Sequence, residues 1–175
     1  MPSDRHLSFV LSSNLIAVAL IALCLCLGAD CGGRGSDNQP PTGPTPGPAT
    51  VTDADLAQCV DTINAYRAAI RKPPMERDAR LEQIAGRAAE QDYLAGDPYQ
   101  HFALTGGEGY ANAENEIITS ATQHGTLRDG INFGLKSFWN EGLSGGHYQN
   151  MVKYSRLGCG VYIDGDNLSL AVDFR

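Results

Sequence analysis

The sequence has few basic residues: 13 Lys and Arg stand against 20 Asp and Glu in 175 residues, and the formal net charge is −7. Because phosphate backbones are bound by clusters of Lys and Arg, this balance argues against a nucleic-acid-binding module. The sequence also lacks an HExxH zinc motif, a G-x-S-x-G nucleophile elbow and a phosphate-binding loop. Hydrophobic residues nevertheless make up 42% and charged residues 19%, which is typical of a globular protein.

No apolar run reaches the ~20 residues that a membrane-spanning helix requires. The longest covers thirteen residues, 15–27, and follows a weakly basic start. This arrangement is typical of a secretory signal, so we expect residues 1–31 to form an export segment. Two ways of processing it are open. Cleavage after Ala29 would release the protein, whereas lipid modification of Cys31 would anchor it as a bacterial lipoprotein.

A linker is expected directly after this segment. Ten of the nineteen residues in 32–50 are Pro or Gly, and none has a large apolar side chain. Such a stretch cannot bury enough surface to offset the entropy of ordering it, so we expect a disordered tether with polyproline character. The remaining residues, 51–175, have the usual size of one folded domain.

The five cysteines divide into two groups. Cys24, Cys26 and Cys31 belong to the expected export segment, which leaves Cys59 and Cys159 in the folded domain. An even pair in an exported protein predicts a disulfide bond, with two buried free thiols as the alternative. The bond would place the first helix on the penultimate strand and would leave no thiol to act as a nucleophile.

Three helices are indicated by the spacing of apolar residues in the domain. Thr52, with Asp55 three residues later, forms a variant of the capping box and predicts a helix that ends before the two prolines at 73–74. Asp78 can cap a second helix. A third helix is expected over 127–139.

The end of the domain predicts a β-hairpin. Apolar residues alternate over 157–163 and over 168–174, and residues 164–167 provide turn chemistry between the two runs. A further extended piece is expected at 116–119, whereas the glycine-rich residues 99–113 predict a loop. Helices followed by strands imply an α+β fold in which helices pack on an antiparallel sheet.

The domain contains six short motifs in this order: Ile63-Asn64-Ala65-Tyr66-Arg67, Pro73-Pro74-Met75, His101, Ala113-Glu114-Asn115, Phe138-Trp139-Asn140-Glu141 and Gly146-His147-Tyr148. Together they resemble the CAP superfamily, which comprises the cysteine-rich secretory proteins, antigen 5 and the plant pathogenesis-related proteins, also called SCP-like proteins. The resemblance covers about residues 55–175. It implies a three-layer α-β-α sandwich with a central antiparallel sheet and a cleft.

In CAP proteins two histidines and two glutamates from separate motifs face that cleft. Carried over to the matching motifs, the resemblance implies a cleft tetrad of His101, Glu114, Glu141 and His147. Ala113 stands where the family usually has Gly, which affects the local turn and not the carboxylate. We expect both histidines to lie in loops.

The chemistry of such a tetrad follows from its side chains. Two neutral imidazoles can bind Zn²⁺ or another divalent metal through nitrogen, so His101 and His147 are the candidate metal ligands. Glu114 and Glu141 could each orient an imidazole through its N–H, or act as a general base. A buried hydrogen-bonded network that only stabilises the fold is the alternative.

The expected function is that of an extracytoplasmic binding module, secreted or anchored through Cys31, whose cleft binds a divalent metal, a small molecule, a lipid or an envelope component. We expect a monomer that binds no nucleic acid and meets the membrane only through that N-terminal anchor. One alternative is a metal-dependent hydrolase of the peptidase type, in which Glu114 or Glu141 activates water. The other is a structural or adhesive envelope protein with a non-catalytic cleft. An enzyme is the least expected of the three.

Overall fold

The structure, a computed structural model, describes residues 50–175. The predicted export segment and all but the last residue of the predicted linker lie outside these residues. The elements are α1 (Asp53–Ala69), β1 (Glu76–Arg77), α2 (Ala79–Ala95), α3 (Gln100–Thr105), η1 (Gly107–Gly109), β2 (Ala113–Ser120), η2 (Thr122–His124), α4 (Leu127–Asn140), η3 (Gly142–Ser144), α5 (Gly146–Lys153), β3 (Arg156–Asp164) and β4 (Asn167–Phe174). Among residues 50–175, no helix combines the length and apolar character needed to cross a membrane.

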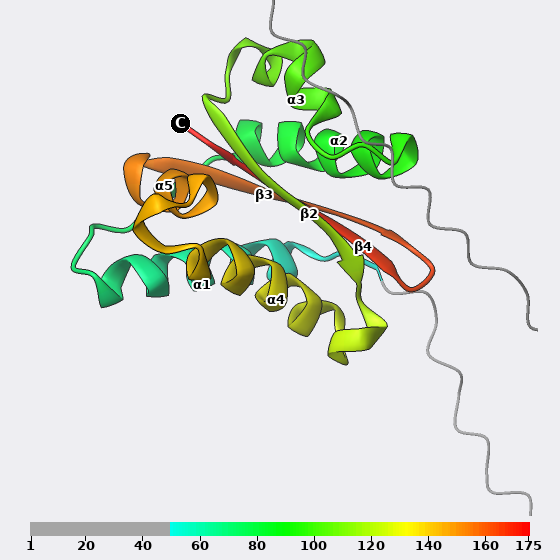
Figure 1. Ribbon diagram of the computed structural model, residues 1–175, viewed down its shortest axis with the longest axis horizontal. Helices are drawn as coiled ribbons and strands as arrows, with labels where there is room; N and C mark the ends of the chain where they lie inside the picture. Colours follow the sequence, from blue (N-terminus) through cyan, green and yellow to red (C-terminus); the bar gives the residue numbers. More distant parts are fainter. Residues whose placement is uncertain (1–49) are drawn as a thin grey trace, which may run out of the picture. The chain divides into compact units, whose positions relative to one another are not determined.

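The strands form one sheet in the order β1-β3-β4-β2, with helices on both faces. Figure 1 shows α2 and α3 on one face and α1, α4 and α5 on the other, so the predicted α+β, three-layer fold is confirmed. The predicted hairpin is β3 and β4, and β2 pairs antiparallel with β4. The two-residue strand β1 adds a parallel pairing with β3, which makes the sheet mixed.

The first two helices begin where their capping residues predict. The Asp55 carboxylate accepts hydrogen bonds from the backbone N (3.0 Å) and hydroxyl (2.6 Å) of Thr52, directly before α1. The Asp78 carboxylate accepts from the backbone N of Arg80 (2.9 Å) and Leu81 (3.2 Å) in the first turn of α2. Side-chain acceptors of this kind satisfy N–H groups that a helix start leaves unpaired.

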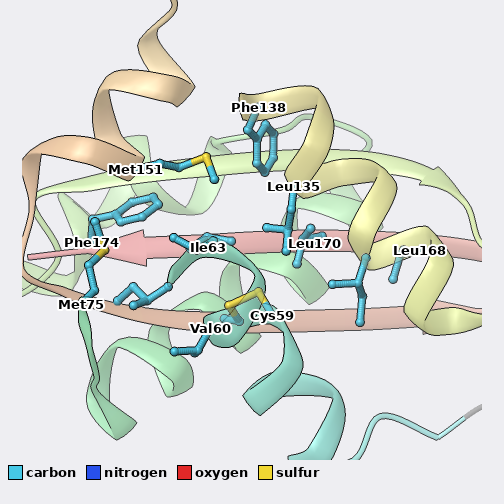
Figure 2. Packing of buried hydrophobic residues seen from close by; sticks show 14 residues of the cluster. Cys59, Val60, Ile63, Met75, Leu135, Phe138, Met151, Leu168, Leu170 and Phe174 are labelled. Carbon is cyan, nitrogen blue, oxygen red and sulfur yellow. A yellow bond between two sulfur atoms is a disulfide. The ribbon is translucent and has the colours of Figure 1, made fainter. Parts of the chain in front are cut away.

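The main hydrophobic core lies between the sheet and the layer of α1, α4 and α5. Figure 2 shows Ile63 of α1, Leu135 of α4 and Leu170 of β4 gathered there. The predicted disulfide between Cys59 and Cys159 is confirmed within this core, with 6.4 Å between the two Cα atoms. It joins α1 to β3, which is the contact expected from the sequence.

The opposite face of the sheet is packed in a different way. A Cβ added to Gly158 would lie 2.1 Å from the backbone N of Glu82, and one added to Gly160 would lie 2.1 Å from the carbonyl carbon of Ala85. The main chain of α2 therefore lies directly against β3. Small side chains complete the contact, namely Ala85, Ala88, Ala89 and Ala171.

Two segments expected as loops contain short helices. The predicted loop 99–113 includes α3 and η1, and His147, also expected in a loop, lies in the first turn of α5. The glycines that indicated loops in fact flank these helices. Gly106 ends α3 with a left-handed φ of 60°, and Gly145 precedes the first residue of α5. Glycine is favoured after the last turn of a helix because it adopts this conformation without strain.

Replacing Gly160 with Ala should strongly destabilise the fold, because the new methyl group would overlap the backbone of α2 and force helix and strand apart. We expect the free energy of unfolding to fall by about 1–3 kcal/mol, the range for overpacked cores. Chemical denaturation measures it. Gly86→Ala on α2 is the matched control, since its Cβ would meet nothing within 4 Å. Equal stability of the two variants would contradict the close packing.

Candidate functional site

The side chains of β2 divide between the two faces of the sheet. Glu114 and Glu116 point toward α2 and α3, because alternate residues of a strand share a face. Asn115 points the other way, where its side-chain N donates to the backbone O of His147 (3.0 Å). The register places Glu114 opposite Asp173 of β4. The face covered by α2 therefore carries acidic residues, while the opposite face carries the hydrophobic core.

A fourth acidic residue reaches this group from the last turn of α2. Asp92 is fully buried, as is Asp173, and Glu114 and Glu116 are 7% and 4% exposed. Three carboxylate oxygens, one from each of Asp92, Glu114 and Glu116, lie within 4.8 Å of one another. Glu114 and Asp173 are hydrogen-bonded to each other through their carboxyl groups, as are Glu116 and Asp92. Apart from these contacts between carboxyl groups, neither oxygen of Glu114 or Asp173 nor Oδ2 of Asp92 has a hydrogen-bond partner in the described part of the chain. We call these four side chains the carboxylate cluster.

Burial and mutual repulsion favour the protonated forms of Glu114, Glu116 and Asp173. Burial, followed by the charges of Asp173, Glu116 and Asp92, raises the pKa of Glu114 to about 9. Burial likewise raises the pKa of Glu116 to about 8 and that of Asp173 to about 7. Near neutral pH the cluster therefore retains protons that exposed carboxyl groups would lose.

His101 lies in α3 beside this cluster. Its backbone N donates to Oδ1 of Asp92 (2.6 Å), and its ring Nε2 is 3.2 Å from Oε1 of Glu108. Glu108 in turn accepts two hydrogen bonds from Arg87, at 2.7 and 2.6 Å. The other ring nitrogen of His101, Nδ1, is buried and has no partner in residues 50–175. His101 therefore offers one uncommitted nitrogen.

His147 is held by groups from two other elements. Glu141, at the end of α4, accepts hydrogen bonds from the backbone N of His147 (3.0 Å) and from its ring Nδ1. Nε2 lies 2.6 Å from the hydroxyl of Tyr99, and the ring packs against that of Phe138 at 4.8 Å between centroids. Because the carboxylate accepts, Nδ1 carries the proton, and in the neutral ring Nε2 accepts from Tyr99.

Tyr99 connects the two sides of the sheet. Its hydroxyl is 3.2 Å from the backbone N of Glu116 and 3.0 Å from its backbone O, at the open edge of β2. Its own backbone N donates to the Glu116 carboxylate at 2.6 Å. The phenol thus extends from the layer of α2 and α3, past the edge strand, to His147 on α5. Burial raises its pKa, so the hydroxyl keeps its proton.

The four residues of the predicted tetrad are distributed between two neighbouring groups. Glu141 and His147 contact each other directly, whereas Glu114 belongs to the carboxylate cluster and His101 lies beside it. The two groups are connected through Tyr99 and Glu116. A metal held jointly by His101 and His147 stays a prediction.

Sequence reasoning missed four residues of this region: Asp92, Tyr99, Glu116 and Asp173. Three of them carried a signal. Asp92 continues the apolar stripe of α2, Glu116 follows Glu114 at the spacing of one strand face, and Asp173 interrupts the apolar final strand. Acidic residues are seldom fully buried, so such positions indicate a functional or cation-binding role. Nothing comparable marked Tyr99.

The chain matches the cysteine-rich secretory protein family, CAP, over residues 60–174. With its three-layer fold and the expected histidine and glutamate motifs, it belongs to the CAP family. A comparison with curated proteins finds no match.

Solved structures agree with this fold. The hookworm platelet inhibitor aligns with a TM-score of 0.52 and 22% identity, covering 71% of this chain and 70% of that one. An extracellular protein with an SCP domain from Bacillus anthracis gives 0.51 and 20%, covering 74% and 45%. NaASP2, solved with Zn²⁺, gives 0.51 and 14%, covering 71% and 83%. At these identities the likeness shows the fold alone.

The raised pKa values predict that stability falls as pH rises. Between the ordinary Glu pKa of 4.5 and about 9, folded Glu114 binds more protons than unfolded Glu114, so each rise in pH favours unfolding. One proton accounts for at most ~1.4 kcal/mol per pH unit. Chemical denaturation in the presence of EDTA, repeated between pH 5 and pH 9, should show that the free energy of unfolding decreases as the pH rises.

Glu114→Gln should reduce the pH dependence of the free energy of unfolding. Its gain in stability over the wild type should be largest at high pH. Glu90→Gln, which removes an exposed charge from α2, should leave the slope unchanged. A wild-type protein that gains stability between pH 5 and pH 9 would refute the buried, protonated cluster.

Proposed function

We propose that this CAP domain is an extracytoplasmic binding module whose binding site is formed by Glu141, His147 and Tyr99, with His101 as a further metal ligand. The proposal rests on how the His147 ring is held and on how much of it is exposed. Both of its nitrogens are held by groups from different elements, yet 30% of the side chain stays exposed. A polar group held in one orientation at an exposed position binds a ligand with little loss of side-chain entropy.

A divalent metal such as Zn²⁺ is the first ligand to test, because the donor atoms suit it. His147 would bind through Nε2, after releasing the Tyr99 hydroxyl, and His101 through Nδ1, which is buried without a partner. Glu141 would keep the His147 ring in the tautomer that exposes a lone pair on Nε2. When bound, the metal would supply a Lewis-acid centre for an anionic or carbonyl group of a further ligand.

Two features support binding over hydrolysis. A general base must be deprotonated at working pH, and the pKa of Glu114, raised to about 9, keeps that residue protonated near pH 7. Both oxygens of Glu141 accept hydrogen bonds from His147, so this carboxylate orients the ring. Both features favour ligand binding over water activation by either glutamate.

The export segment predicted at residues 1–31 and the linker at 32–50 support an extracytoplasmic location. The aligned protein of Bacillus anthracis is itself extracellular. We propose that Cys31 carries a lipid and that the linker holds the domain away from the membrane surface.

Metabolic labelling with palmitate tests the anchor. The chain should incorporate label, and Cys31→Ser should abolish it. An unlabelled wild-type chain would instead indicate cleavage after Ala29 and free secretion.

Titration calorimetry with Zn²⁺ tests the binding site, on protein purified without chelator or histidine tag. His147→Ala should abolish binding, and Glu141→Gln should weaken it by about 10–100-fold, the usual effect of losing a group that orients a ligand. Tyr99→Phe should bind more tightly than wild type, because Nε2 no longer has to release a hydroxyl.

His124→Ala is the matched control, since it removes an imidazole that contacts Thr119 and Phe133 instead of the site. It should bind like wild type. If His147→Ala also binds Zn²⁺ with wild-type affinity, the proposed metal site is wrong. Native mass spectrometry after incubation with envelope lipid extract then tests a lipid or small-molecule ligand at the same residues.

A further inference from the structure

We propose that this domain has a second binding site, which binds the phosphate group of a small molecule. Its ligands are the guanidinium groups of Arg80, in the first turn of α2, and Arg175, directly after β4. Figure 1 shows the C-terminal end of β4 beside the start of α2. The site uses no residue of the histidine site, so it goes beyond the function proposed above and does not depend on it.

The ring of Tyr110 brings the two arginines together. The guanidinium carbon of Arg80 lies over this ring at 4.1 Å from its centroid, and that of Arg175 lies over it at 4.2 Å. The tyrosine is itself held in place, because its hydroxyl donates to Oδ2 of Asp78 (2.9 Å) and its backbone O accepts from Nη1 of Arg175 (3.1 Å). Arginine stacks on aromatic rings through the planar face of the guanidinium, which leaves N–H groups at its edge free to bind an anion.

A third arginine adjoins Arg175 at the end of the sheet. Arg156 and Arg175 exchange both backbone hydrogen bonds, at 2.8 and 3.0 Å, so they extend the β3–β4 register by one cross-strand pair. Directly opposite residues share one face of a sheet, and like charges in such a pair are destabilising. This is the face that α2 covers, because Gly158 lies two residues after Arg156 and contacts that helix. The fold therefore concentrates positive charge beside Arg80, in a chain whose net charge is −7.

The neighbouring carboxylates neutralise Arg156 but not the other two arginines. Nε of Arg156 lies 3.4 Å from the carboxylate of Glu76, and its Nη1 lies 3.5 Å from that of Asp78. Arg80 and Arg175 are exposed, and neither forms an ion pair with another residue in 50–175. Two guanidinium groups that are oriented by one ring and lack a counter-ion in the domain indicate an anionic ligand.

A phosphate group suits this pair of arginines better than a carboxylate does. A carboxylate has two oxygens and is bound in a bidentate manner by one guanidinium, whereas a tetrahedral phosphate has oxygens for two guanidinium groups and carries up to two negative charges. The net charge of −7 repels an extended polyanion, such as a nucleic acid or an anionic membrane surface. The expected ligand is therefore a small molecule with one phosphate group.

NMR titration of the purified, ¹⁵N-labelled protein with sodium phosphate tests the site, with the ionic strength held constant by NaCl. The Nε–H signals of Arg80 and Arg175 should shift and saturate, and sodium acetate should bind more weakly than phosphate. Arg80→Gln and Arg175→Gln should each weaken phosphate binding by ~10-fold or more, the usual effect of losing hydrogen bonds to a charged group.

Two controls separate this site from others. Arg71→Gln removes the same charge from an exposed position after α1 and should bind phosphate like wild type. His147→Ala should also retain phosphate binding, even though it removes the proposed Zn²⁺ ligand. Arg80→Gln keeps the backbone N that donates to Asp78 (2.9 Å), so it remains informative if Arg175→Gln does not fold.

Sedimentation with lipid vesicles distinguishes a small phosphate-bearing ligand from a lipid headgroup. The Cys31→Ser chain, which cannot carry the proposed lipid, should sediment with phosphatidylglycerol vesicles no more than with phosphatidylcholine vesicles. Capture by phosphatidylglycerol that Arg80→Gln abolishes would overturn the assignment to a small molecule.

The proposal is equally overturned if phosphate shifts neither arginine signal in a saturable way. Acetate binding as tight as phosphate binding would overturn the assignment to phosphate. If Arg80→Gln and Arg175→Gln bind phosphate as tightly as Arg71→Gln, the anion lies elsewhere on the surface and the site is wrong.

Discussion

The close contact between α2 and β3 determines where the buried acidic side chains of this domain lie. At Gly158 and Gly160 the backbone of the helix lies where the first atom of any side chain would be. Because the helix lies so low on the sheet, it covers the neighbouring positions of β4 and β2 as well. Asp173 and Glu114 are buried beneath it, and the last turn of α2 adds Asp92. The carboxylate cluster is therefore a consequence of packing the helix at this distance.

The opposite face of the same strands carries the hydrophobic core, whose stability allows the fold to bury these carboxyl groups. Three residues of β4 enter the main core with α1, α4 and α5, namely Leu170, Val172 and Phe174, and they alternate with Ala171 and Asp173 on the opposite face. The Cys59–Cys159 bond joins two elements of that core, and cross-linking restricts the unfolded chain. One face of the sheet thus provides the main hydrophobic core, while the other buries carboxyl groups that hydrogen-bond to one another.

Tyr99 connects the two faces of the sheet at the edge of β2. Its hydroxyl contacts the backbone of Glu116 and the ring of His147, so it links the strand beside the carboxylate cluster to the histidine. The sequence contained the glutamates and histidines of this region as recognisable family motifs, and Glu141 does contact His147. It contained no signal for Tyr99, because a single tyrosine before a short helix could point in any direction.

Local and periodic features of the sequence determined a large part of this protein. The caps at Thr52 and Asp78 and the final hairpin depend on neighbouring residues or on a strand period of two, and the disulfide followed from the count of cysteines left in the exported domain. Only the tertiary structure decided which acidic residues meet. Asp92 and Glu116 come from a helix and a strand far apart in the chain, and their proximity depends on the height and angle at which α2 crosses a twisted sheet. That geometry results from the packing of all layers together, and no local stretch of sequence encodes it.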